Sequence, residues 1–351
     1  MVTTIHPMPQ QTSILHLAFI ACVFCLSMAS CMSESDRRIW TENGQIHTSD
    51  GPHLVKGVCY HPVAIGNDKR TFESLTQDLS LMKEMGVNTI RVYKPIVSKS
   101  VLDEISEAGI SVIISFGYDQ DGVYDLKSGT YLDYIQSFKS HPAILLWELG
   151  NEYNYHPEWF GGSLDVWYET LREAASAIHA EDPNHPVSTA HGEVPDAELL
   201  QELECIDLWG LNVYRWDESH TAIEDFAQRS NKPVYLSELG ADSYMAAAQL
   251  GYEQGENQRA QADATQNLLE HILTDSVNAA GVVVFSFTDG WWKAGKPDQQ
   301  DAGGWAPGSS GVPYDAAANE EYWGLVDIHR KKKEAFWVVK SFYESTVESE
   351  Q

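Results

Sequence analysis

Basic side chains are scarce in this sequence of 351 residues. It contains 23 Lys and Arg residues against 51 Asp and Glu residues, which gives a formal net charge of −28. Such a charge repels nucleic acids and anionic lipid surfaces, so we expect no nucleic-acid partner. The acidic residues are dispersed along the chain and do not by themselves indicate a ligand.

Charged residues are missing from the first thirty positions, which contain no Asp, Glu, Lys or Arg. The apolar run ILHLAFIACVFCLSMAS has the length of a signal peptide and ends in small residues. Because Ala29 and Ser30 directly precede Cys31, residues 1–30 resemble a bacterial lipoprotein signal, after which Cys31 would carry the lipid. We expect an exported protein at the bacterial cell envelope (outer membrane or periplasm) that contacts the membrane only through this anchor. A membrane-spanning segment is the alternative, and the shortness of the run disfavours it.

Cysteine and metal-binding motifs are also rare. Cys22 and Cys25 lie inside the predicted signal, so Cys59 and Cys205 are the remaining cysteines after Cys31. Two cysteines in apolar, strand-like segments form no disulfide framework. The sequence has no HExxH, no paired CxxC, and no G-x-G-x-x-G or G-x-x-x-x-G-K-[ST] after the first predicted strand. We therefore expect neither a catalytic metal nor a cofactor.

Within residues 51–348, short apolar runs alternate with amphipathic segments, a pattern typical of a parallel sheet with crossover helices. The strand-like runs are HLVKGVCY, VNTIRVY, ISVIISF, AILLWEL, HPVSTA, IDLWGLNVY, PVYLSEL and GVVVFSF, eight in all. Eight such units predict an α/β fold, a single (β/α)8 TIM barrel, with a short linker at residues 31–50 before it. An open doubly wound sheet is the alternative, but the nucleotide motifs typical of it are missing.

The two ends of the predicted barrel differ in sequence. Gly86, Gly109 and Gly281 are expected to end helices just before a strand, which marks the end of the barrel opposite the active site. Polar and aromatic residues gather instead where the strands end. They are His61, Arg91, Tyr93, Asn151, Glu152, His191, Asn212, Tyr214, Glu238, Trp291 and Trp292. In a barrel these positions converge on one mouth, where Glu152 and Glu238 would face each other.

Two facing carboxyl groups, with an Arg and a Tyr beside one of them, suit glycoside hydrolysis by the retaining route. One carboxylate attacks the anomeric carbon, and the other group donates and then accepts a proton. The attacking group must stay ionised, whereas the acid needs a pKa raised by burial. Asn151 would hydrogen-bond a sugar hydroxyl next to the reacting carbon. Glu148 lies inside a strand without a preceding Asn, so we assign it a supporting role.

These motifs resemble those of a large clan of retaining β-glycosidases with (β/α)8 barrels. GVNTIRVY, WELGNE and YLSELG are similar to the clan's second, fourth and seventh strands, NVY to the Tyr beside the nucleophile, and FTDGWW to the aromatic platform after strand eight. The segment YWGLVDIHRKKKEAFWVVKSFY is similar to the end of the barrel domain in the family of β-galactosidases, β-glucuronidases and β-mannosidases. The resemblance covers roughly residues 50–345 and implies Glu152 as acid/base and Glu238 as nucleophile.

The sequence therefore predicts a retaining glycoside hydrolase that acts on a β-linked oligo- or polysaccharide, with a β-glucan as the favoured substrate. The predicted substrate-binding residues are His61, Arg91, Asn151, His191, Tyr214, Trp291 and Trp292, and candidates for outer subsites are Trp159, Trp216 and Trp305. Three alternatives stay open. They are a β-glucan transglycosylase with the same residues, an exo-acting β-galactosidase or β-mannosidase, and a barrel that binds polysaccharide without catalysis.

Overall fold

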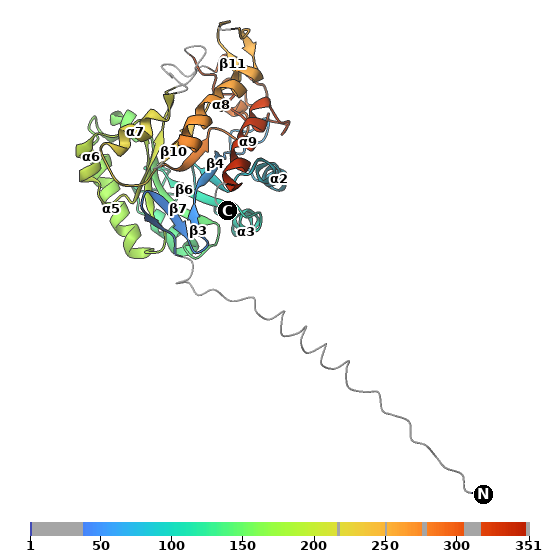
Figure 1. Cartoon of the computed structure of the whole chain (residues 1–351). Coiled ribbons are helices and arrows are strands. Elements are labelled where there is room, and N and C mark those ends of the chain that lie inside the picture. Colours follow the sequence, from blue (N-terminus) through green and yellow to red (C-terminus); the bar gives the residue numbers. More distant parts are fainter. Residues whose placement is uncertain (2–37, 216–217, 250, 276–278, 305–316, 349–351) are drawn as a thin grey trace. The chain divides into compact units, whose positions relative to one another are not determined.

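The computed structural model covers the whole chain and describes every residue except 2–37, 216–217, 250, 276–278, 305–316 and 349–351 (Figure 1). The predicted signal, Cys31, Trp216 and Trp305 thus lie outside the described residues. A helix that crosses a bilayer needs about 20 apolar residues, and no helix in the described part of the chain meets this requirement.

Eight parallel strands close into the barrel that the sequence predicts. In chain order they are β4 (Val55–Cys59), β5 (Thr89–Val92), β6 (Ser111–Phe116), β7 (Ile144–Asn151), β8 (Val187–Gly192), β9 (Leu208–Asn212), β10 (Val234–Leu239) and β13 (Ala279–Val284). Each strand pairs with its neighbours in this order, and β13 returns to β4. The strands coincide with the eight apolar runs because both of their faces are buried.

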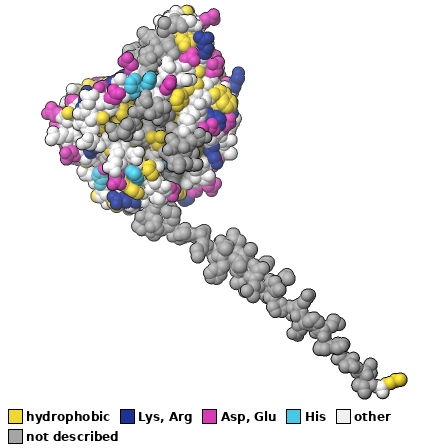
Figure 2. Space-filling model, viewed as in Figure 1, with side chains coloured by type: hydrophobic (Ala, Val, Ile, Leu, Met, Phe, Trp, Pro, Cys, Tyr) yellow, Lys and Arg dark blue, Asp and Glu magenta, His cyan; other side chains and the backbone are white. Residues whose placement is uncertain are grey.

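A helix follows each barrel strand and packs on the outside of the barrel. The helices are α2 (Leu75–Met85), α3 (Lys99–Glu107), α4 (Tyr131–Phe138), α5 (Asp165–Glu181), α6 (Ala197–Glu202), α7 (Thr221–Ala227), α8 (Gln258–Asp275) and α9 (Glu334–Glu348). Their apolar faces, with Met82 of α2 and Ile178 of α5 fully buried, form one core with the outer face of the strands. Figure 2 shows the Asp and Glu side chains scattered over the visible surface.

Three glycines were predicted to end helices just before a strand, and two of them do so. Gly86 ends α2 in the left-handed conformation with φ 83°, and Gly109, with φ 75°, follows the end of α3. Gly281 is different, because it lies inside β13 and not at the end of a helix. A Cβ atom on Gly281 would come within 2.2 Å of the carbonyl oxygen of Val55. The close approach of β4 to β13 therefore explains this glycine.

The predicted linker at residues 31–50 needs correction in its described part. Three short antiparallel strands, β1 (Trp40–Glu42), β2 (Gln45–Thr48) and β3 (Gly51–His53), form a sheet there. The overlooked signal is Asn43-Gly44, whose φ values of 51° and 79° suit the tight turn of a hairpin. Ile46 of β2 is fully buried in the same cluster as inward-facing barrel residues such as Val55. The compact unit accordingly begins at Arg38.

A buried ion pair fixes the start of α9 to the segment after β13. Lys333 Nζ lies 2.5 Å from Asp289 Oδ1 and donates to Ser243 Oγ at 2.9 Å, and both charged side chains are about 2% exposed. Removing one partner of such a pair leaves an uncompensated buried charge. We expect Lys333→Ala to lower the free energy of unfolding by about 3–5 kcal/mol in urea denaturation. The neighbouring exposed Lys331 is a matched control, with an effect within about 0.5 kcal/mol on replacement by Ala. Equal effects of the two variants would contradict this interpretation.

Candidate active site

A cavity of about 630 Å³ opens where the barrel strands end. Six of the predicted site residues line it: His61, Asn151, Glu152, Tyr214, Glu238 and Trp292. Further lining residues include Cys59, Tyr93, Tyr155, Glu193, Asn212, Phe285, Lys293, Glu320 and Trp323. The two carboxyl groups predicted to meet therefore share one pocket.

Glu238 of β10 is held by three donors. Its Oε1 accepts hydrogen bonds from Arg91 Nη1 and from the Tyr93 hydroxyl, both at 2.7 Å, and its Oε2 accepts one from the Tyr214 hydroxyl at 2.9 Å. Burial, with the nearby negative charge of Glu238, raises the pKa values of Tyr93 and Tyr214 well above 10, so both phenols keep their protons at neutral pH. All three contacts fix the position of the Glu238 carboxyl group at the pocket.

Arg91 of β5 connects the residues beneath the pocket. Its Nε donates to Glu148 Oε1 at 2.8 Å, and its Nη2 donates to Asn151 Oδ1 at 2.7 Å. Burial disfavours its charged form, but the carboxylate of Glu148, then Tyr93 and Glu238, hold the pKa of Arg91 well above its usual value. Arg91 is fully buried and absent from the pocket lining. Arg91 was predicted to bind substrate, and the structure places it behind Glu238 and Asn151, where it orients them.

Glu148 occupies the supporting position that the sequence indicates. It is fully buried inside the barrel, where it accepts hydrogen bonds from Arg91, from the Tyr235 hydroxyl at 2.6 Å and from the Ser115 hydroxyl. It does not reach the pocket. Its negative charge compensates the buried guanidinium of Arg91, which explains why a carboxylate is tolerated within an apolar strand.

Glu152 has a different environment from Glu238. It directly follows β7 with φ 55°, a left-handed conformation that is uncommon for residues other than glycine. Burial raises its pKa to about 7, and the charge of Glu238 adds to this rise, while a hydrogen bond from Asn212 and the charge of Arg91 oppose it. At neutral pH Glu152 is therefore able to give up or take up a proton. Two carboxyl groups with unlike environments in one site are typical of an acid and a nucleophile.

The orientation of Asn151 is fixed by the groups behind it. Its Oδ1 accepts from Arg91 Nη2 at 2.7 Å and from Asn212 Nδ2 at 3.1 Å, and Asn212 Oδ1 in turn accepts from the Ser237 hydroxyl. The amide oxygen of Asn151 is thus occupied by two donors. Its NH2 group is the end that is available to donate to a sugar hydroxyl.

Residues 40–289 match the family described as glycosyl hydrolases family 2, TIM barrel domain. The chain belongs to this family. It is 25% identical over 220 residues to a β-glucuronidase of Bacteroides fragilis, covering 58% of this chain and 30% of the relative. It is 24% identical over 223 residues to a 1,3-β-glucanosyltransferase of Schizosaccharomyces pombe, covering 54% of this chain and 48% of the relative. The family 2 barrel thus spans less than half the length of these two relatives.

Solved structures support the same fold. A family 2 β-galacturonidase from Eisenbergiella tayi, bound to galacturonate, superposes with a TM-score of 0.64 at 20% identity, covering 88% of this chain and 54% of that one. A β-glucuronidase from Dictyoglomus thermophilum gives a TM-score of 0.64 at 17% identity, with 88% and 53% coverage. The predicted fold and the predicted family resemblance are confirmed.

The predicted aromatic site residues of the family 2 barrel differ in whether they line the pocket. His61 and Trp292 stack with ring centroids 4.7 Å apart, and both line the pocket. Trp291 does not line it, because this neighbour in the short helical turn η5 (Trp291–Lys293) packs edge-on against His329. Trp159 is 55% exposed and stacks on His156 with ring centroids 3.9 Å apart.

His191, another predicted substrate-binding residue, does not line the pocket. Its Nδ1 donates to the carbonyl oxygen of Glu193 at 2.9 Å, and its ring contacts Trp209. Side chains alternate along a strand, and Ser188 of the same strand β8 points into the barrel to contact the Tyr235 hydroxyl. His191, three residues later, therefore points to the outer side.

Several pocket residues were not assigned a role from the sequence. Tyr93 and Asn212 were visible as polar strand ends, but their contacts with Glu238 and Glu152 depend on which strands are neighbours. Trp323 belongs to the closing segment, where no local pattern indicated that it lines the pocket. Within the described residues, no group of three or more His, Cys, Asp or Glu side chains is arranged to hold a metal ion.

Proposed function

We propose that this family 2 barrel is a retaining glycoside hydrolase that cleaves a β-linked polysaccharide, with a β-glucan as the favoured substrate. One observation carries the proposal. Glu238, held by Arg91 and two phenols, and Glu152, whose pKa is raised to about 7, line the same pocket. Double displacement requires such a pair, one carboxyl group held in place to attack and another that can donate a proton.

The reaction takes place in two steps. Glu238 attacks the anomeric carbon while Glu152 gives its proton to the glycosidic oxygen, so that the bond to the leaving sugar breaks and a glycosyl ester forms on Glu238. Glu152, now a carboxylate, removes a proton from water, and the water oxygen displaces Glu238 from the anomeric carbon. If a sugar hydroxyl takes the place of water, the same steps give transglycosylation. Asn151 donates to the hydroxyl next to the reacting carbon.

The names of curated relatives support a β-linked substrate without fixing the sugar. They include 1,3-β-glucanosyltransferases of Schizosaccharomyces pombe and Arthroderma benhamiae as well as β-glucuronidases and β-galactosidases. The rings of Trp292, Trp323 and Tyr155 at the pocket are suited to pack against sugar faces. We also propose that the barrel is exported and anchored through a lipid on Cys31, on the strength of the apolar run before it.

A panel of β-1,2-, β-1,3-, β-1,4- and β-1,6-glucans, mannans and galactans, with analysis of product length, tests this function. We expect shortened β-glucan products that disappear when Glu238 is replaced. Products longer than the input would identify a transglycosylase, and monosaccharide release from small aryl glycosides would identify an exo-acting enzyme. Absence of any product that depends on Glu238 would leave a polysaccharide-binding barrel as the better explanation.

The raised pKa of Glu152 predicts the alkaline side of the pH profile. A general acid acts in its protonated form, so kcat/KM should be high below the pKa of Glu152 and fall as pH rises through about 7. In Glu152→Ala the fall of kcat/KM near pH 7, the alkaline limb of the profile, should vanish. Turnover should persist on aryl glycosides whose leaving group needs no proton. Glu173→Gln, which changes an exposed carboxyl group on α5, should keep the limb. A limb that stays near pH 7 in Glu152→Ala would rule out Glu152 as the acid.

A further inference from the structure

The charged residues that line the pocket are mostly of one sign. Four of the lining residues are glutamates, namely Glu152, Glu193, Glu238 and Glu320. Lys293 is the single Lys or Arg among the described lining residues. A charged group on a bound sugar would therefore face mainly glutamate side chains.

Lys293 is already engaged by groups of the pocket itself. Its Nζ lies 2.9 Å from Glu320 Oε2 and 4.2 Å from the centroid of the Phe285 ring. The side chains of Lys293 and Glu320 are 19% and 35% exposed, so the ion pair is partly buried. A substrate carboxylate would have to compete with Glu320 for this ammonium group.

The other basic groups near the pocket do not offer a cation to a substrate carboxylate. Arg70 and Lys94, whose charges act on His61, do not line the cavity. Arg70 donates to the backbone carbonyl oxygens of Lys94 and Pro95. Arg91 is fully buried and bound to Glu148, Glu238 and Asn151. Burial, with the positive charges of Arg70 and Lys293, lowers the pKa of His61 to about 4, so its ring is neutral at pH 7.

Arg215, behind Glu193, does not reverse the sign of the pocket. It lies 2.6 Å from a carboxylate oxygen of Glu193 and 2.8 Å from one of Asp225, so that one positive charge faces two negative ones. Arg215 itself does not line the cavity. The net charge of this side of the site therefore remains negative.

We propose, on the basis of the glycosidase function proposed above, that this pocket accepts neutral β-linked sugars and rejects the same sugars oxidised to uronic acids, and that the Lys293–Glu320 pair sets this choice. Rejection follows from repulsion by the acidic lining, together with the lack of an unengaged cation among the described residues that line the cavity. Specificity of this kind uses an unfavourable contact with the wrong ligand as well as favourable contacts with the right one.

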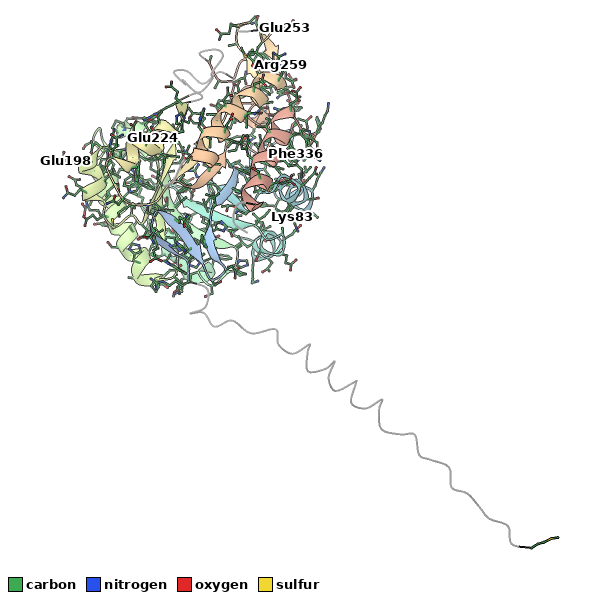
Figure 3. The ribbon with its side chains drawn as sticks, viewed as in Figure 1. Lys83, Glu198, Glu224, Glu253, Arg259 and Phe336 are labelled. Atoms are coloured by element: carbon green, nitrogen blue, oxygen red, sulfur yellow. The ribbon has the colours of Figure 1, made fainter. Side chains whose placement is uncertain are left out.

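The pair also predicts how the selection changes on mutation. Glu320→Gln removes one negative charge and releases Lys293 to meet a sugar carboxylate. Lys293→Met combined with Glu320→Gln removes both charges, so the released ammonium is lost again. Glu198→Gln is a matched control, because it deletes the same charge from the exposed surface of α6, away from the cavity lining (Figure 3).

The test compares β-1,3- and β-1,4-gluco-oligosaccharides with the same oligosaccharides oxidised at C6 to carboxylates. Binding to the full chain is measured by calorimetry at low temperature, and kcat/KM is measured in parallel. We expect neutral ligands to bind on the order of 10- to 100-fold more tightly than their oxidised partners, as repulsion across a few ångströms in a partly buried site predicts. Glu320→Gln should reduce the preference for neutral over oxidised ligands by about tenfold. The variant that combines Lys293→Met with Glu320→Gln should restore most of the preference for neutral ligands. Glu198→Gln should leave this preference unchanged.

The outcomes separate this inference from the proposed function. Oxidised ligands that bind as tightly as neutral ones, or binding of neither kind, would overturn the selection. An unchanged ratio in Glu320→Gln, in a variant that melts at the wild-type temperature, would overturn the role of the Lys293–Glu320 pair. If neutral ligands bind selectively but no turnover depends on Glu238, the selection stands and the proposed hydrolase function fails.

Discussion

Glu238→Ala is expected to lower kcat on the best substrate of the panel by on the order of 10⁴- to 10⁶-fold, as removal of a central catalytic group does in other enzymes. Glu238 is the carboxylate that Arg91, Tyr93 and Tyr214 hold in place, so no other lining residue receives the same three contacts. The variant should keep its fold, because Arg91 retains its ion pair with Glu148. Circular dichroism and thermal melting check this expectation alongside kcat.

Azide distinguishes loss of the nucleophile from general damage to the site. With an activated aryl β-glycoside and Glu238→Ala, azide attacks the anomeric carbon from the vacated face, aryloxide departs, and the product is an α-glycosyl azide. In Glu152→Ala, azide instead displaces the sugar from Glu238 and gives a β-glycosyl azide. Opposite product configurations are expected for the two variants. The same configuration from both would contradict the assignment of roles.

Glu253→Ala is the control for this experiment. Glu253 is exposed in the segment before α8 (Figure 3) and does not line the pocket, so kcat should match that of the unmodified chain. A loss below tenfold in Glu238→Ala would show that Glu238 is not the nucleophile. The lining then offers Glu193 and Glu320 as the remaining carboxylates to test.

The barrel could be predicted because its strands carry a local signal. A strand in an all-parallel sheet is buried on both faces, so it appears in the sequence as a short apolar run between polar segments. AILLWEL, for example, corresponds to β7. The sheet at residues 40–53 has no such runs, and its signal is a two-residue turn at Asn43-Gly44. The burial of Ile46 depends on a contact with β4, which local sequence does not reveal.

The sequence indicated which residues lie near the mouth of the barrel, but not how deep each one lies or where its side chain points. Glu152, Glu238 and Asn151 all line the pocket, since the ends of parallel strands in a barrel meet at one mouth. Whether a side chain reaches the pocket depends on its distance from the strand end and on which side of the strand it points to. Arg91 is too deep, and His191 points outward. Lys293 pairs with Glu320, 27 positions later in the sequence, a contact that no periodic pattern indicates.

Replacing Arg91 tests the central connection of the site. Arg91→Met leaves the carboxylates of Glu148 and Glu238 without their shared cation, and both are buried. We expect the free energy of unfolding to fall by about 3–5 kcal/mol. In the fraction that remains folded, kcat should fall by about 10²- to 10³-fold, since Glu238 and Asn151 lose the group that orients them.

Arg91→Lys separates the charge of Arg91 from its geometry. Lysine keeps the positive charge, but a single ammonium cannot reproduce the planar fork that reaches Glu148, Glu238 and Asn151 at once. We therefore expect this variant to recover more of the stability than of kcat. Arg330→Met is the matched control, because Arg330 forms a comparable pair with the buried Asp78, at 2.8 and 3.0 Å, away from the pocket. It should lose stability without losing kcat per folded molecule. If Arg91→Lys restored both quantities together, a positive charge would suffice at this position, and the three-way geometry would not matter.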